Sequence, residues 1–192
     1  MPNTTSPDLS TEITAAVFTA ETLRTAAGLA ADAYRPVWTG PSGEESTGEA
    51  VGRHLDAAIA LLHRDGWART TNYRITHEGL PADDDKMTVK DMLRALMRLI
   101  RDETDVPASP LSLHTALNRV GEGEHGDTDT AWIAGTVLDF VIRAHTGSDA
   151  ARATAWSERL TRTHTDITAL LTAGADFARA YGPGAAAQAP AA

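Results

Sequence analysis

Apolar residues recur every three or four positions along most of this chain, a spacing typical of helices with one buried face. The composition agrees: 35 Ala and 17 Leu favour helices, whereas the β-branched Val and Ile together number only 15. We therefore predict an all-α fold, a single bundle of six to seven helices over residues 11–181.

Local signals place the first two helices. The first apolar stripe runs over residues 13–34 and ends before Pro36, which cannot continue a helix. Ser46 and Glu49 have the spacing of a capping box, so we expect the second helix to start there. Gly66 stands where the C-terminal end of that helix is expected.

The next two helices also carry start signals. Thr88 and Asp91 have capping-box spacing in front of an apolar stripe. Ser109 and Pro110 are expected to open a short fourth helix, because proline suits the first helical position, and Gly121 to close it.

The segment near 130–145 is the most hydrophobic and is apolar on most of its circumference. Such a helix is usually the central one. Beyond it, an apolar seam that includes Leu160 and His164 predicts either one helix over 149–181 or two pieces divided near 161–165.

Polar or low-complexity segments border these helices. We expect a disordered lead over 1–10, a linker over 36–47 whose residues bury little surface, a loop over 68–86 and a disordered tail over 182–192.

The composition also excludes several classes of protein. Without cysteine there is no disulfide scaffold, zinc–thiolate site or cysteine nucleophile. A formal net charge of −9 opposes general binding to nucleic acid or anionic membranes. No signal-peptide pattern or long apolar run is present, so we expect a cytoplasmic protein. Fifteen Arg against two Lys suggest GC-rich coding, as in actinobacteria.

The acidic clusters do not predict a metal site. The loop over 122–129 holds four carboxylates and His125, but its spacing matches no EF-hand, and the next helix needs a cap from this loop. Asp83, Asp84 and Asp85 are adjacent in a loop and are expected to be solvated. We therefore predict neither a metal nor another cofactor.

No catalytic motif is recognisable: nucleophile elbow, P-loop and dinucleotide fingerprint are all absent. His164 is notable because it lies in an apolar seam. A neutral, hydrogen-bonded core histidine is one interpretation, and a ligand-binding histidine or general base is the other.

Two basic ridges are also predicted on helix faces. The first comprises Lys90, Arg94, Arg98 and Arg101, and the second Arg152, Arg159 and Arg162. Solvated helix faces explain both, and contact with phosphate or nucleic acid is the alternative.

Two stretches, HLDAAIALLHRDGW and WSERLTRTHTDITALL, resemble an uncharacterised family of small helical actinobacterial proteins. The resemblance is carried by the pair Gly66 and Trp67 and by a late Trp…Arg-Thr-His segment, here Trp156, Arg162, Thr163 and His164. It transfers no activity. It implies that Trp67, Trp156 and His164 are recurring features, such as a structural cluster.

These observations lead to three hypotheses. The first is a non-enzymatic cytoplasmic interaction or regulatory protein that binds a protein partner or itself through helical surfaces. The second is a DNA-associated regulator that uses the ridge at 90–101. The third is a small-ligand binder or enzyme with a pocket at His164, to which Trp156, Arg162 and Trp67 contribute.

Overall fold

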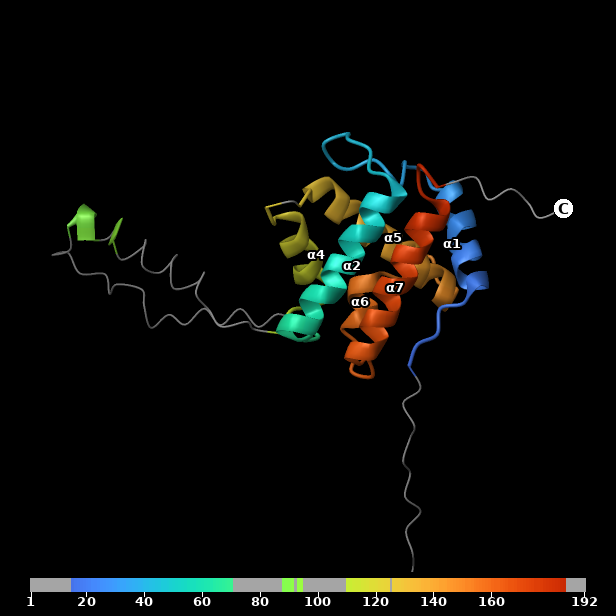
Figure 1. Cartoon of the computed structure of the whole chain (residues 1–192). Helices are drawn as coiled ribbons and strands as arrows, with labels where there is room; N and C mark the ends of the chain where they lie inside the picture. Colours follow the sequence, from blue (N-terminus) through green and yellow to red (C-terminus); the bar gives the residue numbers. More distant parts are fainter. Residues whose placement is uncertain (1–14, 71–87, 92, 95–109, 125, 186–192) are drawn as a thin grey trace, which may run out of the picture.

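The computed structural model describes residues 15–70, 88–91, 93–94, 110–124 and 126–185 (Figure 1). Its helices are α1 (Ala20–Ala31), α2 (Gly48–Asp65), α4 (Leu113–Gly121), α5 (Thr128–Thr146), α6 (Ala153–Ser157) and α7 (His164–Tyr181). The described residues form no β-strand, only two isolated bridges. The all-α prediction is confirmed. The predicted lead over 1–10, most of the loop over 68–86 and most of the tail over 182–192 lie outside these ranges.

Helix α5 is the centre of the bundle, as its hydrophobicity predicts. It contacts α1, α2, α4, α6 and α7. Ile133, Val137 and Leu138 are fully buried on it, whereas Trp132 on its outer face keeps 44% of its surface exposed. Helix α5 is therefore buried on most of its circumference but not on all of it.

Helices α2 and α7 form the most extensive pair and lie side by side (Figure 1). Gly174 of α7 lets this helix approach both α5 and α2, since an added Cβ would lie 2.5 Å from Cδ2 of Leu138 on α5 and 3.2 Å from Cδ1 of Leu55 on α2. At the solvent edge, the Arg179 guanidinium of α7 pairs with Glu49 and Asp56 of α2.

Three helix starts differ from the sequence prediction. Helix α1 begins at Ala20 behind the cap Thr19, so residues 15–19 are extended rather than helical. Thr47, not Ser46, caps α2. Ser112, not Ser109, caps α4. In each helix the capping oxygen accepts the backbone N–H three residues ahead, a geometry open to several nearby Ser or Thr side chains.

Ser46 has a tertiary role instead. Its hydroxyl hydrogen-bonds the Thr130 hydroxyl at 2.7 Å, which joins the 36–47 linker to the start of α5. Ser42 of the same linker binds the carboxylate of Asp129 through both its backbone N–H and its hydroxyl. Val37 keeps only 5% of its surface exposed. The linker therefore packs against the bundle.

The late apolar seam forms two helices, α6 and α7, rather than one. Thr163 and Asp166 form a reciprocal capping box that starts α7. Leu160, expected in the buried seam, lies in the connection and is 85% exposed. His164 is the first residue of α7, at the end of the bundle rather than in the middle of a seam.

The backbone just after α2 is hydrogen-bonded to the backbone just before α4. Gly66 ends α2 as expected, with a positive φ of 86°. Its carbonyl accepts the Leu111 N–H, and the Ala68 N–H donates to the Leu111 carbonyl, each at 3.0 Å. Residues 69–110 are therefore inserted between two backbone positions that are held together. No described helix is long and apolar enough to cross a membrane.

Candidate functional site

The four residues predicted to bind a ligand lie around the α6–α7 connection and the end of α2. Trp156 of α6 keeps 2% of its surface exposed. The Arg162 guanidinium carbon lies 4.0 Å from the Trp156 ring centroid, in cation–π geometry. Trp67 is linked to this connection through Arg69, whose guanidinium lies 5.7 Å from the Trp67 ring and donates to the carbonyls of Leu160 and Arg162.

His164 pairs with another histidine. The rings of His164 and His63 lie with their centroids 5.0 Å apart. Burial, followed by the nearby His63, lowers the pKa of His164. Its imidazole is therefore neutral near pH 7, with one ring nitrogen able to donate a hydrogen bond and the other able to accept one or to act as a base.

Four buried side-chain nitrogens in the described part of the chain have no hydrogen-bond partner: Trp67 Nε1, Trp156 Nε1, Arg162 Nε and His164 Nε2. They belong to the four predicted residues. Buried polar atoms usually have a partner, so this end of the bundle has unused hydrogen-bonding capacity. The aromatic and cation–π contacts nevertheless give the same residues a structural explanation, consistent with the cluster that the resemblance implied.

The acidic loop before α5 serves mainly as a helix cap. Asp127 accepts the backbone N–H groups of Asp129 and Thr130, at 3.1 and 2.8 Å, and also binds the Thr130 hydroxyl. The described residues hold no group of three or more His, Asp or Glu side chains that could bind a metal ion. His125 lies outside them.

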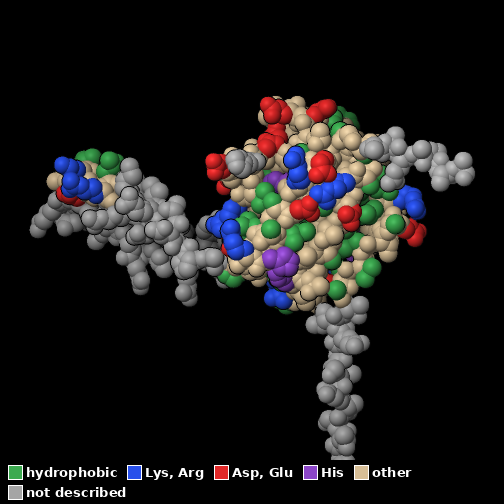
Figure 2. Space-filling view, in the orientation of Figure 1, with side chains coloured by type: hydrophobic (Ala, Val, Ile, Leu, Met, Phe, Trp, Pro, Cys, Tyr) green, Lys and Arg blue, Asp and Glu red, His purple; other side chains and the backbone are tan. Residues whose placement is uncertain are grey.

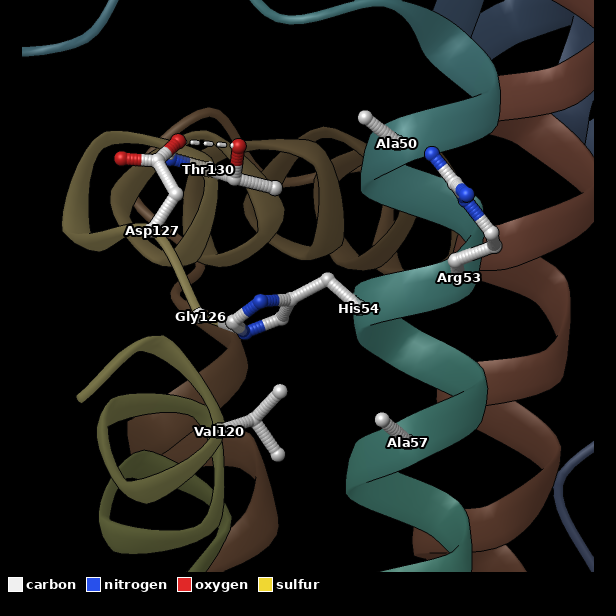
Figure 3. A pocket seen from close by; sticks show the side chains of 8 residues that line it. All are labelled: Ala50, Arg53, His54, Ala57, Val120, Gly126, Asp127 and Thr130. Atoms are coloured by element: carbon white, nitrogen blue, oxygen red, sulfur yellow. Dashed lines mark hydrogen bonds between the residues drawn. The ribbon is translucent and has the colours of Figure 1, made fainter. Parts of the chain in front are cut away.

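A cavity of about 330 Å³ lies between α2, α4 and the start of α5, and the sequence gives no sign of it (Figure 3). His54 projects into it from α2 and keeps only 6% of its surface exposed. Its Nε2 lies 3.1 Å from the Leu117 carbonyl. Because a carbonyl can only accept, Nε2 carries the proton and Nδ1 retains its lone pair. Burial lowers the pKa of His54, which is therefore neutral.

Two other polar side chains of this cavity, Asp127 and Thr130, already have partners, whereas the Arg53 side chain forms no ion pair or hydrogen bond with the described residues. Figure 3 shows the Asp127 carboxylate turned toward Thr130 and away from the His54 ring. Thr130, the only hydroxyl in the lining, binds Asp127 and Ser46. His54 thus lacks an adjacent nucleophile, and its clearest role is to join α2 to α4.

The first basic ridge is described only in part. Thr88 accepts the Asp91 N–H at 3.3 Å and starts a helix, as predicted. Arg94 pairs with Asp91 at 3.4 Å on a solvent-exposed surface, and Lys90 is exposed. Arg98 and Arg101 lie outside the described residues. On the same helix, Val89 and Leu93 are 81% and 58% exposed.

Comparison with known proteins gives a family and no activity. A family described as a family of unknown function (DUF6197) matches residues 46–177, more than half of the chain. The match runs from just before α2 into α7. No curated protein and no solved structure matches the chain. The expectation of an uncharacterised family is thereby confirmed.

Proposed function

Because the chain belongs to DUF6197, a family of unknown function, we propose a function from its own surfaces: it is a non-enzymatic, cytoplasmic interaction protein. We infer that it associates with a second copy of itself through the helix that begins at Thr88. We call this helix the docking helix.

The exposure of Val89 and Leu93 is the observation that carries the proposal. They are one helical turn apart and so share a face. In the sequence the same spacing continues through Met92, Leu96, Leu99 and Ile100. Large apolar side chains arranged in this way are typical of a helix that binds a groove or another helix.

The position of the docking helix in the chain also supports the proposal. The backbone bonds between Gly66, Ala68 and Leu111 close the body of the bundle without residues 69–110. The docking helix, whose described residues are 88–91 and 93–94, therefore belongs to the insertion and not to the closed body of the bundle.

Charge favours a second copy as the occupant. Residues 88–101 contain four basic and one acidic residue, a net charge of +3, whereas the described body (15–70, 110–124 and 126–185) contains 16 acidic and 11 basic residues, a net charge of −5. Figure 2 shows hydrophobic and basic side chains together on the described part of the docking helix, and both acidic and basic side chains on the visible face of the body. A basic amphipathic helix and an acidic body are complementary, and their attraction weakens with salt.

A pair of matched variants tests the proposal. Val89→Gln with Leu93→Gln removes the apolar face but keeps a good helix former at both positions. Leu160→Gln is the control, because Leu160 is 85% exposed and lies on the body. We expect wild type and the control to form dimers and the double variant to remain a 20.3 kDa monomer by light scattering. Equal masses for all three proteins would contradict the proposal.

A further inference from the structure

A cavity of about 430 Å³ lies beside the connection between α5 and α6, away from the docking helix. Its described lining consists of Thr146, Ser148, Ala150, Ala151, Arg152, Ala155, Trp156 and Arg159. The only charged side chains in this lining are two arginines. The charge of this lining is therefore opposite in sign to the net charge of −9 of the whole chain.

Both arginines have unused donors. The Arg159 side chain forms no ion pair or hydrogen bond with the described residues, and Arg159 is exposed. Arg152 faces the Asp139 carboxylate through Nε, at 3.4 Å, and donates through Nη1 to the Ala151 carbonyl at 3.0 Å. Its Nη2 takes part in none of these contacts. Two guanidinium groups therefore remain able to bind an anion.

One neutral donor adds to the lining. Ser148 is exposed, and its hydroxyl forms no hydrogen bond with the described residues. Trp156 contributes an apolar wall, because its indole nitrogen is buried and out of reach of solvent. A hydroxyl next to an unpaired guanidinium group suits phosphate oxygens, since phosphate accepts several hydrogen bonds at once.

The nearby carboxylates offset only part of this charge. Asp139 accepts the Ala153 N–H at 2.7 Å and forms an ion pair with Arg152 at 3.4 Å, so the unpaired positive charge of the pocket is that of Arg159. Asp149 and Glu158, the sequence neighbours of two lining residues, are exposed and do not line the cavity.

We propose that this cavity, the arginine pocket, binds a small phosphorylated molecule, with Arg152 and Arg159 holding the phosphate. A volume of about 430 Å³ lies in the range of small-ligand sites. A small ligand is favoured over nucleic acid or an anionic membrane because the net charge of −9 repels extended polyanions.

Titration calorimetry with inorganic phosphate and simple phosphate monoesters, at constant ionic strength and with acetate as the reference anion, tests this inference. Arg159→Gln removes one guanidinium, and Arg24→Gln is the matched control. Arg24 is exposed on α1 and forms no ion pair with the described residues. We expect Arg159→Gln to weaken phosphate binding about ten- to a hundredfold, the loss of one or two charged hydrogen bonds, and Arg24→Gln to leave it unchanged.

The proposal is overturned if the two variants bind phosphate alike, or if acetate binds as well as phosphate. It is also overturned if Arg159-dependent binding appears only with duplex DNA or with phosphatidylserine vesicles, which are included as separate titrations. Circular dichroism establishes that each variant is folded. Because Arg159 lies outside the docking helix, failure here leaves the self-association result unaffected.

Discussion

The imidazole of His54 on α2 donates from Nε2 to the carbonyl of Leu117 on α4, with the two atoms 3.1 Å apart. His54 and Leu117 are 63 positions apart in the sequence. The buried side chain of His54 therefore joins two helices that are distant in the sequence. Burial is the main reason that the pKa of this imidazole is lowered.

The lowered pKa of His54 predicts acid sensitivity. Below about pH 6.5 the unfolded chain binds a proton at this imidazole that the folded protein resists, so stability falls as the pH falls toward the folded-state pKa. His54→Gln keeps an amide donor but cannot titrate. We expect the free energy of unfolding, measured with urea, to fall more between pH 7 and 5.5 for the wild-type protein than for His54→Gln. An exposed control, His114→Gln, should retain the wild-type dependence. The same slope in wild type and His54→Gln would contradict this role.

Two glycines should respond oppositely to alanine. At Gly174 an added Cβ meets Leu138 Cδ2 at 2.5 Å, so we expect Gly174→Ala to lower the free energy of unfolding by about 1–3 kcal/mol. At Gly135 of α5 no atom lies within 4 Å of the added Cβ. We expect Gly135→Ala to raise the free energy of unfolding by about 0.5–1 kcal/mol, because alanine has the higher helix propensity. Chemical denaturation compares the two variants, and a stabilising Gly174→Ala would contradict the close packing of α7 against α5 at this position.

Asp166 should contribute more than an ordinary helix cap. Its carboxylate accepts the Thr163 N–H at 2.9 Å and the Ala16 N–H at 2.6 Å, and the residue is 1% exposed. Asp166→Ala removes the reciprocal half of the capping box and leaves two partly buried N–H donors without their partner, so we expect the free energy of unfolding to fall by about 1–3 kcal/mol. Hydrogen exchange should also accelerate at Ala16. Asp149→Ala, at an exposed site, serves as the control, and equal stability of the two variants would refute the role of Asp166.

The sequence predicts elements whose causes are local. The apolar stripes, the central position of α5 and the end of α2 at Gly66 follow from spacing and from a backbone conformation that favours glycine. The division between α6 and α7 also has a local signal, since Thr163 and Asp166 have capping-box spacing.

Tertiary partners explain what the sequence does not predict. Ser46 and Thr47 are both suitable caps, and the bond from Ser46 to Thr130, 84 residues away, favours Thr47 as the cap. The His54 cavity needs residues from α2, α4 and the start of α5, so it has no sequence motif. The described lining of the arginine pocket comes from the single stretch 146–159, but the spacing of its residues matches no known motif. The sequence also singles out four residues that lie near one end of the bundle, namely His164, Trp156, Arg162 and Trp67. Their role in binding a ligand remains a prediction.

The most direct test of self-association is the light-scattering mass of the wild-type protein over a range of concentrations, at low and moderate salt, with and without duplex DNA. The mass should rise with concentration from 20.3 kDa toward twice that value. It should rise less at moderate salt and should be indifferent to DNA. A constant mass of 20.3 kDa at every concentration would contradict self-association. A complex with DNA at low salt that Arg94→Glu abolishes would instead favour a DNA-associated regulator.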